Sequence, residues 1–312
     1  MLIIYNKEYI KRMENTIIYE DLAVFGQASN KCKNDSANKM RENIICAIIN
    51  NKIPKKYYEN SNDWRNMKKH LISIIEDVFE LKKYFKITCI KIAGRKANFD
   101  FSISIYITKI LYMKKNIEFK FNAKSITKAP QFLSLASNFN TSYAEYYYDT
   151  YNQELTQVYE LPHISRVDYL KYIHQTDYSK HEWFNKLKKQ ETNIKKKSIK
   201  KKIVDKSIHE YLTTNINKID IAQFNEKLYL SQKNKNFIMY CPITKNFYAD
   251  VITDSELTIV SMHLNIKKNN LCNNIICNTL NPNTKLVMLL RWKNTNGILF
   301  PAWQISIKRS NK

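Results

Sequence analysis

The chain has 312 residues, 44% of them hydrophobic, and its 51 lysine and arginine residues against 28 acidic residues give a net charge of +23. No run of about eighteen apolar residues occurs, so no membrane-spanning helix is predicted. With only three glycines the sequence cannot form a glycine-rich phosphate loop or a dinucleotide-binding fingerprint. Kinases, P-loop ATPases and nicotinamide enzymes of the usual kinds are therefore not expected.

The positive charge predicts a polyanionic partner, DNA or alternatively RNA. Only seven of the basic residues are arginine, while lysine, asparagine, isoleucine and tyrosine, which have A/T-rich codons, are abundant. Part of the charge therefore reflects an A/T-rich genome, such as that of a large DNA virus, a parasite or a low-GC bacterium. A zinc site at Cys241, His263, Cys272 and Cys277 is conceivable, but the spacing is not a standard one.

The start of the chain does not resemble a secretory signal, because it is short, carries Lys and Glu and lacks a small-residue cleavage site. Six scattered cysteines in a chain without such a signal favour a reducing compartment. We expect an intracellular protein of the cytoplasm or nucleus, including that of an infected host cell. The sequence leaves the oligomeric state open.

The first half alternates between helical and extended patterns. Apolar residues recur at spacings of three and four in two segments, each with a capping residue at its start. Period-two patterns follow, and Pro130 then precedes another helical start. The predicted elements are helices over 35–50 and 63–83, strands over 86–93, 98–107 and 111–122, and a helix beginning over 131–138.

The second half is predicted to be mainly β after a helix over 167–189. A lysine-dense stretch, 186–206, is interpreted as a solvated helix or a linker, and it sets the domain boundary. The predicted strands are 237–241, 247–252, 257–264, 285–293 and 298–308. We therefore expect a core domain over 1–185, the basic segment over 186–206, and a mainly β accessory domain over 207–312.

Two predicted strands hold the residues that indicate chemistry. Phenylalanine or isoleucine stands at every second position over 99–105 and again over 117–121, so Asp100 lies on the polar face of the first strand, and Glu118 and Lys120 on that of the second. A hairpin turn at Thr108–Lys109 would pair Phe101 with Ile117 and set Asp100 opposite Glu118, with Cβ atoms about 5 Å apart. A turn over 114–116 would shift this register.

Two carboxylates at that distance repel each other unless a cation lies between them. Mg²⁺ prefers carboxylate and carbonyl oxygens, lowers the pKa of a bound water and neutralises charge on a phosphorane. A lysine two residues from a glutamate on a strand shares its face, so both can meet one phosphate. Asp100, Glu118 and Lys120 thus form the minimal set for metal-assisted phosphodiester cleavage.

The order of a helix, three antiparallel strands carrying Asp100 and then Glu118-Phe119-Lys120, and a further helix resembles the PD-(D/E)XK nuclease superfamily over roughly residues 36–140. The resemblance implies a restriction-endonuclease-like α/β core, a mixed sheet flanked by helices. It implies that Asp100, Glu118 and the main-chain carbonyl of Phe119 bind Mg²⁺ or Mn²⁺, and that Lys120 orients the attacking water. The family's proline before the aspartate is absent here.

Some members of that family add a glutamate on the preceding helix, for which Glu42 and Glu76 are both candidates, and a glutamine on the following helix, for which Gln131 is the candidate. The predicted function is Mg²⁺-dependent hydrolysis of DNA. We expect phosphate-backbone contacts from four basic residues near the site: Arg95, Lys96, Lys124 and Lys128.

The alternative is that this polar face is a solvated sheet face with an ordinary ion pair. Glu-x-Lys recurs at Glu80-Leu81-Lys82 in a predicted helix, so the tripeptide alone discriminates little. The protein would then be a non-catalytic, basic nucleic-acid-binding or virion protein.

Overall fold

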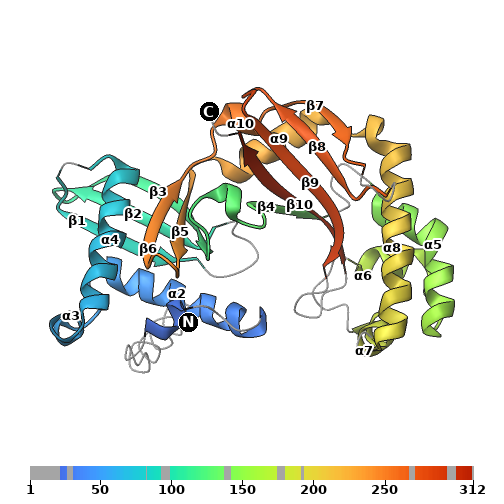
Figure 1. Ribbon diagram of the computed structural model, residues 1–312, viewed down its shortest axis with the longest axis horizontal. Helices are drawn as coiled ribbons and strands as arrows, with labels where there is room; N and C mark the ends of the chain where they lie inside the picture. The colour runs from blue at the N-terminus through green and yellow to red at the C-terminus, as the bar shows by residue number, and fades with distance from the viewer. Residues whose placement is uncertain are drawn as a thin grey trace. The chain divides into compact units, whose positions relative to one another are not determined.

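The computed structural model describes residues 22–26, 31–81, 83–92, 99–136, 142–173, 180–190, 193–266, 271–293 and 300–310, and the chain forms two compact units (Figure 1). Unit 1 contains the described residues up to Lys128 together with Asn234–Val251. Unit 2 contains Ala129–Lys233 and the described residues from Ile252 onward. The fold is mixed α/β: unit 1 has a mixed sheet flanked by helices, and the C-terminal region is β-rich.

The sheet of unit 1 has the strand order β1-β2-β3-β5-β6. The first three strands form an antiparallel meander, β5 runs parallel to β3, and β6 returns antiparallel to β5. A parallel pair requires a crossover connection, and here that connection contains the first part of unit 2. The strands are β1 (Lys86–Lys91), β2 (Phe101–Ile107), β3 (Ile110–Phe121), β5 (Lys235–Cys241) and β6 (Asn246–Asp250).

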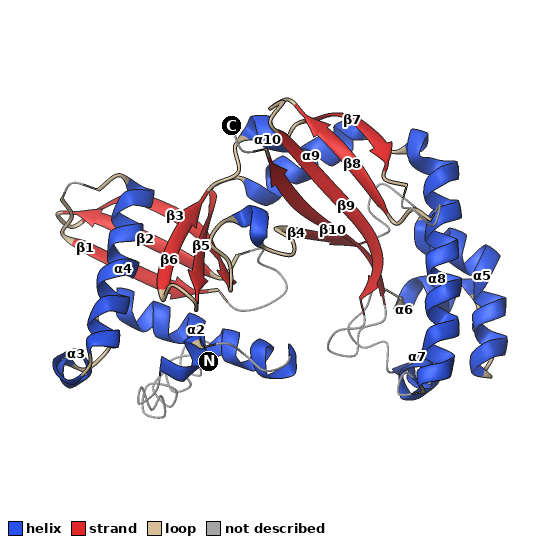
Figure 2. Ribbon diagram, viewed as in Figure 1, coloured by secondary structure: helices blue, strands red, loops and turns tan. Residues whose placement is uncertain are grey.

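The described helices of unit 1 provide the core that supports this sheet. In α4 the apolar residues Met67, Leu71 and Ile75 recur on one stripe and are buried. They join one hydrophobic cluster with residues of α2 and the sheet. Figure 2 distinguishes these helices from the strands by colour. The elements are η1 (Leu22–Phe25), α2 (Lys31–Ile49), α3 (Lys55–Asn60), α4 (Asn62–Phe79) and η2 (Ile126–Lys128).

Unit 2 contains an antiparallel sheet with the order β4-β10-β9-β8-β7. Its strands are β4 (Leu133–Ala136), β7 (Ile259–Leu264), β8 (Asn274–Thr279), β9 (Thr284–Lys293) and β10 (Phe300–Arg309). Its helices are α5 (Tyr143–Tyr159), α6 (Arg166–Tyr172), α7 (Glu182–Lys189), α8 (Ile194–Asn215), η5 (Ile216–Lys218), α9 (Ile221–Gln232) and α10 (Asp254–Leu257).

The two compact units do not divide the chain at the predicted boundary within 186–206. This lysine-rich stretch includes the first half of α8, whose apolar side is buried at Ile203, Ile208 and Leu212, so it belongs to the body of unit 2. The units differ from the predicted domains because β5 and β6, which come after α8 in the chain, complete the sheet of unit 1. Composition gives no local signal that late strands will complete an earlier sheet.

Two predicted helices also differ from the structure. The segment predicted as a helix over 131–138 contains β4, in which buried Leu133 and Leu135 alternate with Ser134 and pair with β10. The helix predicted over 167–189 is two helices, α6 and α7. The helices over 35–50 and 63–83 and the three strands that follow are confirmed with small shifts at their ends.

Candidate active site

Asp100 immediately precedes β2 and is hydrogen-bonded to both neighbouring strands. Its main-chain N–H donates to the carbonyl of Ile117 in β3 (2.9 Å), and its carbonyl accepts from the N–H of Ile92, just after β1 (2.8 Å). Its carboxylate Oδ2 accepts from the N–H of Phe119 (2.8 Å). These three hydrogen bonds fix the carboxyl group at the entrance to β2.

The predicted register holds from Phe101 to Ile105 but not next to the turn. The two-residue turn at Thr108–Lys109 sets Ile107 opposite Ile110, and a one-residue shift between Ile105 and Tyr106 then brings Phe101 opposite Ile117. The regular ladder ends at that pair. Asp100 therefore does not form a cross-strand pair with Glu118, because its side chain takes the Phe119 N–H instead.

Glu118 is held by two lysines. Its Oε1 forms an ion pair with the ammonium of Lys120, the residue two positions along β3 on the same face. Its Oε2 lies 2.5 Å from the Nζ of Lys235. The Glu118 and Lys120 side chains are 16% and 18% exposed, so this carboxylate is partly screened from water and bonded at both oxygens.

Lys235 is a site residue that the sequence did not indicate. It is the first residue of β5, and the parallel pairing sets it beside Asn116 of β3, on the same side as Glu118. Its side chain is 2% exposed. Burial lowers the pKa of its ammonium, while the charge of Glu118 acts in the opposite direction. Lys235 shares one face of β5 with buried Phe237 and Met239, and this spacing of two was the available signal, but one lysine among so many did not stand out.

Glu42 reaches the same region from α2, where it forms an ion pair with Lys91 of β1 (3.0 Å). The helix is tied to β1 by Asn50, whose amide both accepts from the N–H of Cys89 (2.9 Å) and donates to its carbonyl (2.8 Å). These contacts set which turn of α2 faces the strands.

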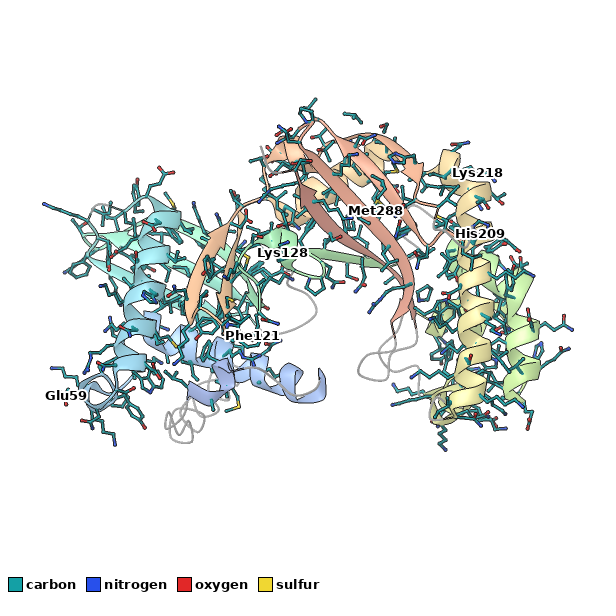
Figure 3. The ribbon with its side chains drawn as sticks, viewed as in Figure 1. Glu59, Phe121, Lys128, His209, Lys218 and Met288 are labelled. Atoms are coloured by element: carbon teal, nitrogen blue, oxygen red, sulfur yellow. The ribbon has the colours of Figure 1, made fainter. Side chains whose placement is uncertain are left out.

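Arg41 connects the same helix to β3. Its buried guanidinium lies 3.3 Å from the centre of the Phe121 ring, labelled in Figure 3, at the end of β3. Burial lowers the pKa of Arg41 to about 10. Because Arg41 precedes Glu42, this stacked contact helps to position the glutamate.

The charges of these carboxylates influence one another. Burial raises the pKa of Asp100 from its ordinary value of 3.8 to about 6, against the hydrogen bond from Phe119, which lowers it. The negative charges of Glu42 and Glu118 raise the pKa of Asp100 further, and the positive charge of Lys120 lowers it. Of the two candidate helical glutamates, Glu42 is thus the one that acts on Asp100.

Three carboxylates and three ammonium groups make up this site, which we term the carboxylate–lysine cluster. With Asp100 ionised, the charges of the six groups sum to zero. Its members are Glu42, Asp100 and Glu118 on the acidic side and Lys91, Lys120 and Lys235 on the basic side.

The donor atoms of the cluster suit a hard divalent cation in chemical type, since they are carboxylate oxygens beside a main-chain carbonyl. The raised pKa of Asp100 also marks a carboxylate whose charge is poorly compensated. As the side chains lie, however, no group of three or more His, Cys, Asp or Glu residues in the described part of the chain is close enough to form a metal site. Both oxygens of Glu118 bind ammonium groups instead.

The other predicted site residues lie elsewhere or remain apart. Gln131 is in unit 2, where its Oε1 accepts a hydrogen bond from Gln304, and it precedes a strand rather than standing on a helix. Glu76 accepts from the hydroxyl of Tyr84 (3.1 Å). Lys124 and Lys128 are exposed in unit 1, with Lys128 at the end of η2 (Figure 3). Arg95 and Lys96 lie outside the described residues.

A separate groove of about 930 Å³ lies in unit 1, between α3, α4 and the turn after β5. Tyr57, Trp64 and Lys245 are among the residues that line it, and no member of the carboxylate–lysine cluster does. The charge cluster and the groove are therefore distinct features of unit 1.

Comparison with known proteins gives no family to which the chain can be assigned: neither a protein-family model nor a curated protein matches it. Within the described residues, no helix combines the length and the apolar character that crossing a membrane requires.

Proposed function

We propose that this chain is a metal-dependent nuclease that hydrolyses DNA phosphodiester bonds, with the PD-(D/E)XK resemblance extending to its core. The observation that carries the proposal is that the charges of Glu42, Glu118 and Lys120, which come from α2 and β3, all act on Asp100 at the start of β2. A chance surface ion pair does not explain a half-buried aspartate whose pKa is raised to about 6, and perturbed carboxyl groups gather at functional sites.

In this proposal Asp100, Glu118 and the carbonyl of Phe119 hold Mg²⁺ or Mn²⁺. When bound, the ion supplies an activated water and neutralises charge on the phosphate. Lys120 presents a fixed positive charge beside Glu118 and orients the attacking water, so that it stabilises charge developing on the phosphate oxygens. Glu42 adds negative charge beside Asp100 and is itself balanced by Lys91.

The excess of basic residues supports DNA as the partner, with RNA as the alternative substrate. Exposed Lys124 and Lys128 are proposed to contact the phosphate backbone, and Arg95 and Lys96 are retained as further candidates. The free cysteines, among them Cys46 next to buried Cys89, support an intracellular setting in the cytoplasm or nucleus, including that of an infected cell.

Cleavage assays on the full-length chain test the proposal. We expect plasmid or single-stranded DNA to be cut with Mg²⁺ and not with EDTA, and D100N and K120M to lower the rate by about 100-fold or more, as for the loss of other preorganised charges. RNA in a parallel reaction decides the substrate. K114M is the matched control, because Lys114 is exposed on the same face of β3 outside the cluster. Wild-type rates in D100N would contradict the proposed site.

The second candidate is a non-catalytic, basic nucleic-acid-binding or virion protein. Helix α8 favours it, because five of its lysines are exposed while apolar residues of the same helix are buried. The lysines are Lys195, Lys197, Lys201, Lys202 and Lys206. Salt-dependent retention on DNA without cleavage under any metal condition would support this candidate.

A further inference from the structure

Cys46 of α2 and Cys89 of β1 place two thiols in contact inside unit 1. Their side chains are hydrogen-bonded to each other, and the Cys46 thiol also lies 3.2 Å from the carbonyl oxygen of Cys89. Cys46 is half-buried, whereas Cys89 is 4% exposed. Both cysteines are free, so the chain holds a dithiol where a helix meets the edge strand of the sheet.

The backbone around the two thiols is held in place on both sides. Asn50, one helical turn after Cys46, accepts from the N–H of Cys89 (2.9 Å) and donates to the carbonyl of the same residue (2.8 Å). Glu42, one turn before Cys46, is paired with Lys91 of the same strand (3.0 Å). A disulfide, whose sulfurs lie about 2.05 Å apart, therefore requires the two touching side chains to close up while the helix stays on the strand.

The two thiols differ in chemical character. The hydrogen bond from Cys89 lowers the pKa of Cys46, and a main-chain hydrogen bond from Lys91 and the positive charges of Lys52 and Lys91 act in the same direction, against burial. The hydrogen bond to Cys46 and burial raise the pKa of Cys89 well above its ordinary range. Because the thiolate is the nucleophile, the more exposed Cys46 is the thiol that reacts first.

We propose that Cys46 is an oxidation site that reacts with peroxides, and that Cys89 is the thiol that converts the oxidised Cys46 into a Cys46–Cys89 disulfide. In the first step the Cys46 thiolate attacks one oxygen of hydrogen peroxide, the O–O bond breaks, and a sulfenic acid and hydroxide form. In the second step the sulfur of Cys89 attacks that of Cys46, the S–O bond breaks, and the Cys89 proton leaves with the hydroxyl group as water. The peroxide supplies the whole two-electron oxidation. The proposal is independent of the nuclease assignment, because neither thiol belongs to the carboxylate–lysine cluster.

The disulfide ties α2 to β1 and closes the segment 46–89 into a loop. A closed loop restricts the unfolded chain and so stabilises the folded one. In a reducing compartment the two thiols stay free, and the covalent link between helix and strand appears only when peroxide is present.

Peroxide treatment of the full-length chain, followed by alkylation of the remaining thiols and peptide mapping without reduction, tests the proposal. We expect the peptides that contain Cys46 and Cys89 to be joined to each other, and dithiothreitol to separate them. Cys277 is the internal control, because it is fully buried and burial raises its pKa to about 12. It should remain reduced and in its own peptide.

Single variants separate the roles of the two thiols. In C89S the sulfenic acid should persist at Cys46, where dimedone traps it at least about tenfold faster than at Cys277. In C46S the buried Cys89 should stay reduced, since it has lost the partner that reacts first. Circular dichroism establishes that each variant is folded, and the mapping of the wild type depends on neither.

Thermal unfolding measures the effect of the link. We expect the midpoint of the oxidised wild type to lie about 5 °C or more above that of the reduced protein, and peroxide to leave the midpoint of the C46S/C89S double variant unchanged. An equal midpoint for the oxidised and reduced wild type would contradict the tie between α2 and β1.

Three chemical outcomes would overturn the proposal. The first is recovery of Cys46 and Cys89 as alkylated, free thiols from the peroxide-treated wild type. The second is pairing of either thiol with a different cysteine. The third is oxidation of Cys89 in C46S as fast as in the wild type, which would show that Cys46 is not the thiol that meets the peroxide.

Discussion

Asp100 reduces the stability of the folded chain when it is ionised. Its pKa rises from 3.8 to about 6, first because it is buried and then because Glu42 and Glu118 are near, so the folded chain binds this proton more tightly than the unfolded chain does. Between about pH 4 and pH 6 the unfolded state has already lost the proton. The free energy of unfolding therefore falls as the pH rises through this window, and the loss persists at higher pH.

Replacing Asp100 by Asn tests this cost. At pH 8 we expect D100N to raise the free energy of unfolding by about 1–3 kcal/mol, since the neutral amide can still accept from the Phe119 N–H. Below about pH 4 both forms are neutral and the gain should vanish. Urea denaturation of both proteins at pH 8 and pH 4 measures it. An equal effect at the two pH values would show that ionisation is not the cause.

Local patterning was sufficient to find part of this site. Alternation identified the polar faces at Asp100, Glu118 and Lys120, because it depends on residues near in sequence. The pairing of Phe101 with Ile117 was predicted, but the strands reach it through a one-residue shift between Ile105 and Tyr106 that the sequence did not indicate. Lys235 contacts Glu118 across 117 positions, and no periodicity in a single sequence reports which distant strand will lie beside β3.

At the scale of elements, α10 is joined to the end of β10 by one buried carboxylate. Glu256 accepts from the guanidinium of Arg309 (2.6 and 3.0 Å) and from the hydroxyl of Thr284 (3.1 Å), and it completes a capping box with Thr253. Burial alone would raise the pKa of Glu256. The hydrogen bonds and positive charge of Arg309, together with the hydrogen bond from the Thr253 N–H, hold this pKa below its ordinary value.

Replacing Glu256 by Ala should lower the free energy of unfolding by about 3 kcal/mol at pH 7, because a partly buried arginine and two threonines lose their partner. The depressed pKa means that the wild-type advantage exists above about pH 4.5 and is lost as the pH falls below it. Thermal unfolding at pH 7 and pH 4 gives the comparison. E59A, at an exposed position in α3 (Figure 3), should leave the free energy of unfolding unchanged at both pH values. An equal loss of stability in E59A and E256A would contradict this account.

Elements with a strong hydrophobic periodicity were predicted well, and elements whose structure depends on pairing with a distant segment were not. The stripe through Met67, Leu71 and Ile75 specifies α4 by itself. The segment at Leu133 becomes β4 because β10 pairs with it, and β10 lies about 170 residues further along. A short apolar segment can follow either pattern until its partner is known.

At the scale of the whole molecule, unit 1 is built from two separated parts of the chain. Its sheet needs β5 and β6, which follow most of unit 2 in sequence. A fragment of residues 1–185, the core that the sequence predicted, lacks both strands. It exposes the edge of β3 and removes the Lys235 partner of Glu118, so we expect it to aggregate or remain unfolded.

A rearranged fragment should fold where that one fails. Residues 1–128 joined to 234–251 by a flexible linker of about 12 residues, which spans about 20 Å, contain every described strand of the unit 1 sheet. We expect cooperative unfolding in urea and retention of the Glu118–Lys235 pair, read out as a loss of stability on K235M substitution. The same fragment without 234–251 is the control. If both rearranged and truncated fragments unfold without cooperativity, unit 1 depends on unit 2 for its stability, and the division of the chain into two independently stable units would be wrong.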